Sequence, residues 1–187
     1  MITKIIAEHL LLVEQIRNTC LAQIQQFAEI CSQGLQRGNR LYLMGNGGSA
    51  ADCQHLAAEF VGKFQRIRRG LPAIALTTDT SILTAVGNDY GFDAIFMRQI
   101  EALVNPGDIV IGMSTSGNSG NVIQAIELAH EMGAVTIGLS GQDGGQLRGI
   151  CDLCIQVPSD VAARIQEAHI LIGHIVCEFV EEVYKDE

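Results

Sequence analysis

The stretch Leu41–Glu59, LYLMGNGGSAADCQHLAAE, decides the fold that we predict for this chain. It opens with a short apolar run ending at Met44, which has the length and composition of a buried strand. A glycine-rich loop follows, and after Ser49, a candidate N-cap, the pattern predicts a helix to about Phe64. A strand, a glycine loop and a helix N-terminus in this order form an anion-binding site, because free N–H groups and the positive end of the helix dipole meet there.

The same predicted helix carries a histidine and a glutamate on one face. His55 and Glu59 are four residues apart, and residues at this spacing lie one above the other on a helix. A solvated polar stripe is the ordinary explanation of such a pair. Here the helix begins at the anion site, so we favour chemistry on a phosphorylated small molecule. Lys63, one turn beyond Glu59, is a candidate ligand for phosphate or hydroxyl groups.

From residue 40 onward, short β-branched segments alternate with helical patterns. Five strands are predicted, at Leu41–Met44, Ala73–Leu76, Ile109–Met113, Val135–Leu139 and Leu153–Val157. Helices are predicted between and after them, at 50–64, 79–87, 92–104, 119–132, near 145–150, and from about 162 to 184. This alternation predicts βαβ units, and therefore a doubly wound α/β domain whose five-stranded parallel sheet is covered on both faces.

A helical segment at about 3–36 precedes the first strand, as one helix or as two with a break near Asn18. It is not needed to cover a sheet of this size. We therefore expect it to pack either on another subunit or on the core of its own chain.

Composition excludes several classes of protein. The 187 residues, 48% of them hydrophobic, suit one domain with a sizeable core. A net charge of −9 argues against a nucleic-acid surface, so local amides and a few cations must hold any anionic ligand. No apolar run approaches the roughly 20 residues of a membrane span, and we expect no signal peptide. The six scattered cysteines are typical of reduced thiols in a cytosolic protein.

A second polar loop is expected beside the first. In doubly wound sheets, ligands bind beyond the carboxyl ends of the strands. The segment Ser114–Ser119, STSGNS, follows the third strand and, like the first loop, is small, polar and opens a helix. One loop suits a phosphate and the other suits sugar hydroxyls. The alternative is a simple helix cap by Ser119, although three consecutive hydroxyl residues exceed what capping requires.

The first loop also satisfies a loose dinucleotide fingerprint, Gly45-x-Gly47-x-x-Ala50. The acidic residue expected roughly 20 positions later is missing, because the segment Lys63–Arg69 stands there. Asp79, after the second strand, is the nearest substitute. A dinucleotide site is therefore disfavoured.

The last predicted helix carries polar residues within an apolar segment. Gln166 and His174 are eight residues apart, about 80° around the helix axis and about 12 Å along it. A buried polar group requires a partner, and each residue alone would ordinarily be a satisfied core residue. The two share a ligand only if it lies between them.

Four segments, GNGGSAADCQHLAAEF, AVGNDYGF, STSGNS and RIQEAHILIGH, together resemble the phosphoheptose isomerases of the sugar-isomerase (SIS) domain superfamily. The likeness runs over essentially the whole chain. It implies one flavodoxin-like SIS domain over 1–187, with N-terminal helices at 1–38 for oligomer packing and an α/β core with a C-terminal helix at 39–187. It also implies a cytoplasmic homotetramer with active sites between subunits.

The resemblance further implies an aldose–ketose isomerase that converts D-sedoheptulose 7-phosphate to D-glycero-D-manno-heptose 7-phosphate, the first step towards the ADP-heptose of lipopolysaccharide cores. Proton transfer would pass through an enediol(ate), with Glu59 as the base and His174 as the acid. One zinc ion per subunit would be bound by His55, Glu59, Gln166 and His174. The substrate site would be lined by Asn46, Gly47, Gly48, Ser49, Glu59, Asn88, Asp89, Ser114, Thr115, Ser116, Ser119 and Gln166.

In this superfamily the phosphate is expected at the loop Ser114–Ser119, which we call the serine loop. A non-catalytic SIS binding module, such as the DnaA-binding relatives of these enzymes, is the alternative. Such a module needs neither base nor acid, so the joint presence of His55, Glu59 and His174 disfavours it.

Overall fold

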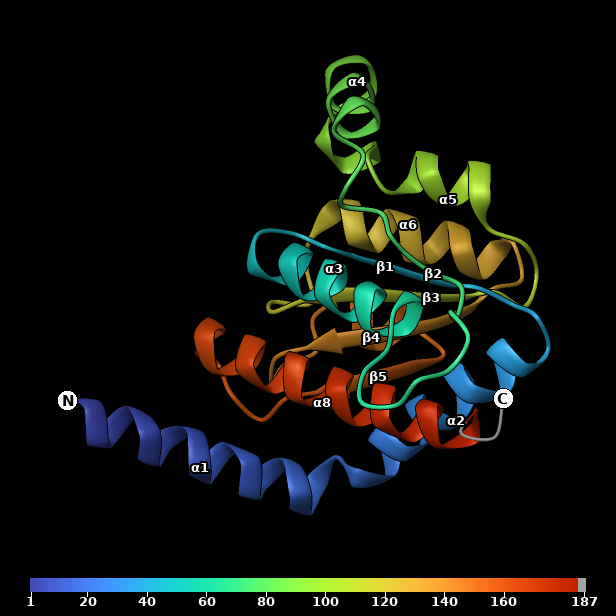
Figure 1. Ribbon diagram of the computed structural model, residues 1–187. Coiled ribbons are helices and arrows are strands. Elements are labelled where there is room, and N and C mark those ends of the chain that lie inside the picture. The colour runs from blue at the N-terminus through green and yellow to red at the C-terminus, as the bar shows by residue number, and fades with distance from the viewer. Residues whose placement is uncertain (185–187) are drawn as a thin grey trace.

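The structure, a computed structural model, describes residues 1–184 and is built around one parallel sheet (Figure 1). Its strands are β1 (Leu41–Gly45), β2 (Ala73–Ala75), β3 (Ile109–Ser114), β4 (Val135–Ser140) and β5 (Leu153–Gln156). Their order is β2-β1-β3-β4-β5, and every neighbouring pair is parallel. This order is flavodoxin-like and confirms the predicted doubly wound five-stranded sheet.

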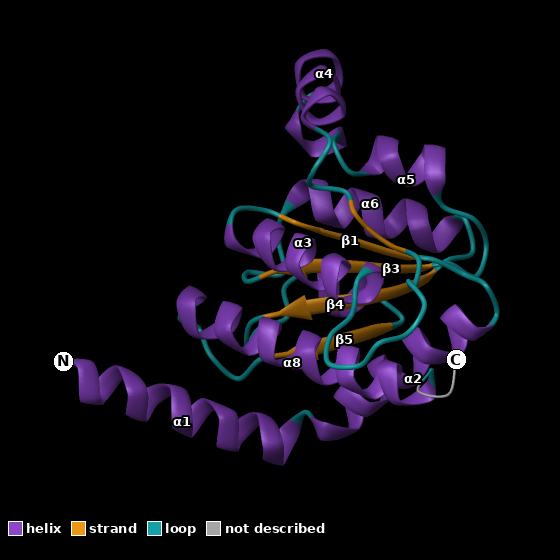
Figure 2. Cartoon of the chain, viewed as in Figure 1, coloured by secondary structure: helices purple, strands orange, loops and turns teal. Residues whose placement is uncertain are grey.

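Helices cover both faces of the sheet (Figure 2). Within residues 1–184 they are α1 (Ile2–Thr19), α2 (Leu21–Gln36), α3 (Gly48–Val61), α4 (Thr80–Tyr90), α5 (Met97–Leu103), α6 (Gly120–Glu131), α7 (Leu147–Ile150) and α8 (Ala162–Val183), with a 3-10 turn η1 (Phe92–Ala94).

The strand β1 shows why the sheet is covered twice. All five of its residues are buried. Leu41 and Leu43 join the core formed with α2, α3 and α8, whereas Tyr42 and Met44 join the core formed with α5, α6 and α7. Successive side chains of a strand point to opposite faces, so an uninterrupted apolar run requires a core on each side. Burying each large apolar side chain contributes roughly 1.5–3 kcal/mol to the stability of the fold. The strand is therefore held firmly on both faces, and this fixes the position at which the next loop begins.

The N-terminal segment is two helices, and the break at Cys20 lies two residues from Asn18, near which it was predicted. The helix α2 packs on the core through residues such as Phe27. The helix α1 buries only Leu12 and Ile16 and extends away from the body of the molecule (Figure 1). Its first half exposes Ile2, Ile5, Ile6, Leu10 and Leu11. Packing on the core of its own chain is therefore confirmed for α2. The apolar face of α1 is left uncovered within one chain, and its packing on another subunit stays a prediction.

Several helix boundaries differ from the predictions. The segment predicted as one helix at 92–104 is the turn η1 followed by α5, and α3 ends at Val61 rather than near Phe64. The helix α3 begins at Gly48 with Gly47 as N-cap, so Ser49 is not the cap but a buried residue of the first turn. Gly47 has a φ of 55°, which glycine adopts without strain. The helix α4 continues past Gly87 to Tyr90. Its first residue follows Asp79, whose carboxylate caps the helix by accepting a hydrogen bond from the Ile82 N–H at 2.9 Å.

All six cysteines are free thiols. Among the helices of residues 1–184, none combines the length and apolar character that crossing a membrane requires.

Candidate functional site

The carboxyl ends of the parallel strands place several polar loops at one edge of the sheet. A hollow of about 250 Å³ lies there, between the loops that follow β3, β4 and β5. It is lined by Thr115, Ser116, Asn118, Gly141, Gln142, Asp143, Ser159, Asp160 and Ile165. Two of the predicted substrate residues, Thr115 and Ser116, therefore face a space large enough for part of a small ligand.

The hydroxyls of the serine loop contact one another and do not cap the helix α6. Ser114 Oγ lies 2.9 Å from Ser119 Oγ and 3.4 Å from Ser116 Oγ. Ser119 is the N-cap residue of α6, yet within the described chain its side chain makes no capping hydrogen bond. The simple cap is therefore not the role of this serine, and a cluster of hydroxyls stands at the positive end of a 12-residue helix.

The loop after β4 fixes the serine loop in place. Gly117 has a φ of 67°, and a Cβ built on it would lie 2.1 Å from the Gly144 carbonyl oxygen. The Leu147 N–H donates a hydrogen bond to the Gly117 carbonyl at 3.1 Å, and the Gln146 N–H donates to Asn118 Oδ1 at 3.1 Å. Only glycine allows this approach of two backbones, so the conformation of the serine loop depends on packing as well as on its own residues.

A pair of amides joins the first loop to α6. Asn46 and Asn121 exchange two hydrogen bonds, each of 2.8 Å between Nδ2 and Oδ1. Asn46 is one of the predicted substrate residues, and its amide is engaged in this pair. Asn121 is buried. It was not predicted as a site residue, because nothing in the local sequence distinguishes it from an ordinary residue in the first turn of a helix.

The predicted acid–base residues meet where α3 packs on α8. His55 Nε2 lies 2.9 Å from His174 Nε2 and 3.5 Å from Glu59 Oε1. The two imidazole rings have centroids 5.1 Å apart. The Glu59 side chain is 22% exposed and that of His55 is 50% exposed, so the group lies at the edge of the core and is open to solvent on one side. The structure therefore brings His55, Glu59 and His174 together, as proton transfer would require.

Asp52 belongs to the same group and was missed. It lies one turn before His55, on the same face of α3. Its Oδ2 atom is buried and has no hydrogen-bond partner among the described residues. Burial raises the pKa of the Asp52 carboxyl, and the neighbouring His55 and His174 partly oppose this rise. The three-residue spacing from His55 is the signal that could have found it.

Gln166 lies against the start of α3. A Cβ built on Gly48 would come within 2.7 Å of Gln166 Nε2 and 2.8 Å of Gln166 Oε1, so a glycine at position 48 makes room for the amide. Its neighbour Ile165 lines the hollow at the serine loop. Gln166 thus lies between the start of α3 and the hollow at the serine loop. Within residues 1–184, no hydrogen bond joins Gln166 to His174.

His55, Glu59, Gln166 and His174 are the predicted metal ligands. Within residues 1–184, no three or more His, Cys, Asp or Glu side chains already form a group that could hold a metal ion. Two imidazole nitrogens and a carboxylate oxygen nevertheless converge at 2.9 and 3.5 Å. Ligand bonds of about 2.0–2.2 Å in a tetrahedral zinc site separate the donor atoms by roughly 3.3–3.5 Å, so small side-chain shifts would accommodate the ion. His55, Glu59 and His174 fit such an ion, and the role of all four residues as its ligands stays a prediction.

Asn88 and Asp89 lie apart from these groups. They occupy the last turn of α4, where Asn88 Nδ2 donates a hydrogen bond to Asp89 Oδ1 at 2.7 Å. None of the residues of α4, all of them described, is buried, and the helix projects from the sheet on the side away from α8 (Figure 1). Within one chain the structure does not bring this pair to His174. Lys63 is exposed beyond the end of α3.

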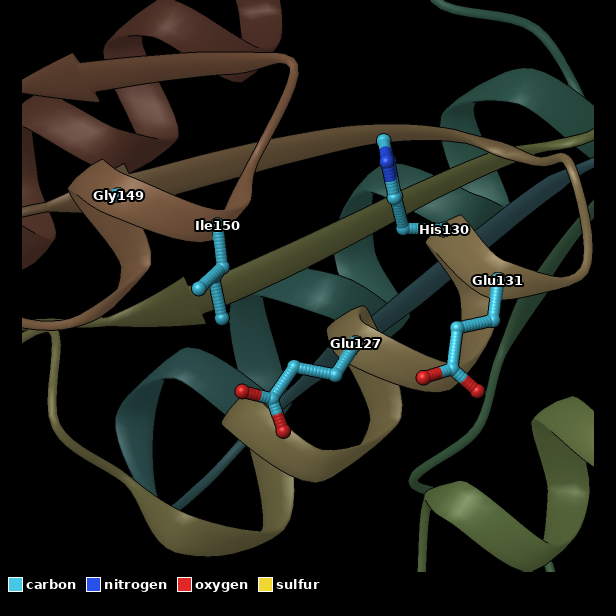
Figure 3. A pocket seen from close by; sticks show the side chains of 5 residues that line it. All are labelled: Glu127, His130, Glu131, Gly149 and Ile150. Atoms are coloured by element: carbon cyan, nitrogen blue, oxygen red, sulfur yellow. The ribbon is translucent and has the colours of Figure 1, made fainter.

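A larger hollow, of about 520 Å³, lies elsewhere, between α6 and α7 (Figure 3). It is lined by Glu127, His130, Glu131, Gly149 and Ile150. In Figure 3 the two carboxylates project from successive turns of α6 into this space. Two negative charges would repel a phosphate, and the hollow contains none of the predicted site residues. Size alone therefore does not locate the site, and the carboxyl edge of the sheet is the better candidate.

Comparisons with known proteins agree with this geometry. A family model for the SIS domain matches residues 6–141. The chain is 60% identical over 170 residues to the phosphoheptose isomerase of Geobacter sulfurreducens, which covers 91% of this chain and 90% of the relative. Its structure is similar to that of a phosphoheptose isomerase from Neisseria gonorrhoeae, with a TM-score of 0.92, 43% identity and 97% of both chains covered. A phosphoheptose isomerase from Francisella tularensis gives a TM-score of 0.94 at 37% identity, covering 97% of this chain and 96% of that one.

Proposed function

Because the chain belongs to the phosphoheptose isomerases of the SIS-domain family, and is therefore a sugar-phosphate isomerase, we propose that it converts D-sedoheptulose 7-phosphate to D-glycero-D-manno-heptose 7-phosphate. The observation that carries the proposal is the meeting of His55, Glu59 and His174 in a chain that also clusters three hydroxyls at the N-terminus of α6. One part offers proton transfer and the other offers a place for a phosphate.

The phosphate end of the substrate would bind at the serine loop. The hydroxyls of Ser114, Ser116 and Ser119 gather at the N-terminus of α6, where the helix dipole favours an anion. This arrangement suits a protein with a net charge of −9, which has few cations to offer. The sugar chain would then extend past Gln166 towards α3, since the Gln166 amide occupies the space beside Gly48 that a Cβ would fill and its neighbour Ile165 lines the hollow.

The chemical step requires two proton movements. Moving the carbonyl from C2 to C1 removes a proton from C1 and returns one to C2 through a cis-enediol(ate), while a second proton passes between the two oxygens. Glu59 would carry the proton between the carbons, and His174 would relay the proton between the oxygens. General acid–base catalysis of this kind contributes typically about 10²–10⁴-fold to the rate when the base and the acid lie within reach of the protons that they transfer.

His55, Glu59, Gln166 and His174 would hold a zinc ion, one per subunit. When bound, the ion would polarise the substrate carbonyl. An amide oxygen among hard and borderline ligands suggests modest affinity, so chelation is expected to be possible without unfolding.

We also propose a homotetramer with active sites between subunits. The uncovered apolar face of α1 supports it, as does a hollow of about 330 Å³ between α1 and α8 lined by Ile5, Ile6, His9, Leu10, Arg164 and Glu167. Association would also let Asn88 and Asp89 reach an active site of another subunit, with α4 of one subunit approaching that site.

The placement in the cytoplasm and the use of the product for ADP-heptose and lipopolysaccharide rest on the family resemblance.

The test is direct. Purified protein is incubated with sedoheptulose 7-phosphate, and the aldose signals are followed by NMR with and without a chelator, while light scattering gives the subunit number. Appearance of the heptose aldose is the expected result. Binding of the sugar phosphate without turnover, in chelator-free and zinc-supplemented samples alike, would instead identify a non-catalytic binding module.

A further inference from the structure

A buried ion pair lies beyond the candidate site, near the C-terminal ends of α3 and α8. The side chains of Arg68 and Glu181 are 1% and 2% exposed, and Arg68 Nε lies 3.3 Å from Glu181 Oε1. Burying two charges carries a large desolvation cost, and an apolar pair of similar volume is often at least as stable. Stability alone therefore does not explain why charges occupy these positions.

Glu181 fixes the segment that follows α3. Its carboxylate accepts hydrogen bonds from the backbone N–H groups of Phe64 at 3.0 Å, Gln65 at 2.7 Å and Arg66 at 2.8 Å. Burial raises the pKa of this carboxyl, but the three N–H donors and Arg68 outweigh burial and hold the pKa below its usual range. The group is thus a charged carboxylate at neutral pH, and it holds residues 64–66 in one conformation.

Arg68 fixes the last turn of α3. Its guanidinium donates hydrogen bonds to the carbonyls of Glu59 and Phe60, both at 2.8 Å. It also donates to the Gly62 carbonyl at 3.3 Å. The last carbonyls of a helix lack partners within the helix, and a cation there interacts favourably with the helix dipole. The backbone of the proposed base is therefore held directly by this arginine.

The segment held by Glu181 also reaches the proposed acid. The Phe64 ring packs on the His174 ring, with centroids 5.3 Å apart. His174 and Glu181 are seven residues apart on α8, which is two turns along the same face. One continuous network thus runs from the Glu59 carbonyl through the buried pair and Phe64 to the His174 ring.

We propose that Arg68 and Glu181 form a clamp that sets the relative positions of Glu59 and His174 for proton transfer. Both are positioning residues, since they act through the backbone of Glu59 and the ring of Phe64. The inference rests on the proposed function, because it concerns the geometry of the proposed base and acid. Its rival is a clamp that only stabilises the end of α3.

The test is the Glu181→Gln variant, which keeps the size of the side chain and removes its charge. Because a misplacement of about 1 Å can cost up to ~100-fold in rate, we expect kcat for sedoheptulose 7-phosphate to fall roughly 10- to 100-fold. The KM should change far less, because the serine loop does not touch the clamp. Thermal unfolding of the same samples shows whether the protein stays folded at the assay temperature.

Glu182→Gln is the matched control. Glu182 is the next residue, its side chain is 44% exposed, and it pairs with Arg66 at the surface. This control should keep the wild-type kcat and KM. A folded Glu181→Gln protein with the kcat of the control would overturn the clamp. Absence of turnover in the wild type and in the control would overturn the proposed function itself, and the clamp with it.

A second variant covers the case in which Glu181→Gln does not fold. Phe64→Leu keeps an apolar side chain, though a smaller one, and removes the flat ring that contacts His174 without changing either residue of the buried pair. We expect kcat to fall by roughly three- to tenfold with KM nearly unchanged, since the acid loses part of its positioning. A wild-type kcat in this variant would contradict the clamp independently of Glu181.

Discussion

The two halves of the candidate site are built in different ways. The serine loop gathers Ser114, Ser116 and Ser119 from one run of six residues, and a helix N-terminus adds its dipole. The acid–base group instead joins His55 and Glu59 on α3 to His174 on α8, and the two histidines in contact are 119 residues apart. One half is a local structure, and the other exists only when two helices pack.

This difference indicates what a substitution should change. In the serine loop, a side chain acts through binding, because hydroxyls and backbone receive the ligand. In the acid–base group, a side chain acts through the chemical step, because its position relative to a partner that is distant in the sequence determines proton transfer. Each prediction below tests whether binding and chemistry separate in this way.

The largest effect is expected for Glu59→Gln. The amide keeps the shape of the side chain but does not accept a proton from carbon, so kcat should fall by at least about 10²–10⁴-fold. The fold should persist, since Arg68 holds the Glu59 carbonyl rather than its side chain. Turnover is followed by NMR, and binding of the sugar phosphate by calorimetry. Appreciable activity in this variant would count against the assigned base.

His174→Gln should also suppress turnover by orders of magnitude, because general acid catalysis contributes typically 10²–10⁴-fold. Its contacts with His55 and Phe64 would be lost as well. The control is His130→Gln, which changes an exposed histidine at the hollow of Figure 3, where the side chain is 59% exposed. A wild-type rate in His174→Gln would refute the role of this residue.

Ser116→Leu should act on the other half of the site. A bulky apolar side chain at the wall of the hollow should weaken sugar-phosphate binding by about tenfold, or about 1.4 kcal/mol, with a smaller change in kcat. Calorimetry with sedoheptulose 7-phosphate measures the affinity. An unaltered affinity would mean that the phosphate binds elsewhere, and the division between binding and chemistry would fail.

The fold could be predicted because its signals are local. The run Leu41–Met44 is apolar throughout, and the strand observed is Leu41–Gly45. Boundaries were missed where packing overrides propensity. Gly48 and Ser49 disfavour a helix by themselves, yet α3 begins there because Gly45 must approach Ser49 closely: a Cβ on Gly45 would lie 2.9 Å from Ser49 Cβ.

The site could be predicted only in part. The spacing of His55 and Glu59 places them on one face of a helix. No spacing in the sequence predicts that His174 lies next to them, and only the family resemblance indicated His174 as their partner. Asp52 has the right spacing as well, but its buried and unpaired carboxyl oxygen is a property of the packed helices. For Asn88, the structure shows an exposed helix in a single chain, so its role depends on a partner that one sequence does not describe.

The last prediction concerns the stability of the connection between the two halves, where the smallest effect on turnover is expected. His169 lies on α8 between Gln166 and His174, is fully buried, and its Nε2–H donates a hydrogen bond to the Ser140 carbonyl at 3.2 Å. Ser140 is in register with Ser114 at the start of the serine loop. Burial lowers the pKa of His169 to about 4, and the hydrogen bond to Ser140 opposes this only in part. His169 is therefore neutral in the folded protein at neutral pH.

The sign of the pH effect follows from this pKa. An unfolded histidine binds a proton near pH 6.5, whereas His169 in the folded protein binds one only near pH 4, so stability is lost as the pH falls from about 6.5 towards 4. At pH 5 the free energy of unfolding should be lower by about 2 kcal/mol on account of this residue. Thermal unfolding at pH 7.5, 6 and 5 measures it. His169→Asn should lose this pH dependence of the free energy of unfolding, whereas the His130→Gln control keeps it. An equal pH dependence in both variants would show that His169 is not its source.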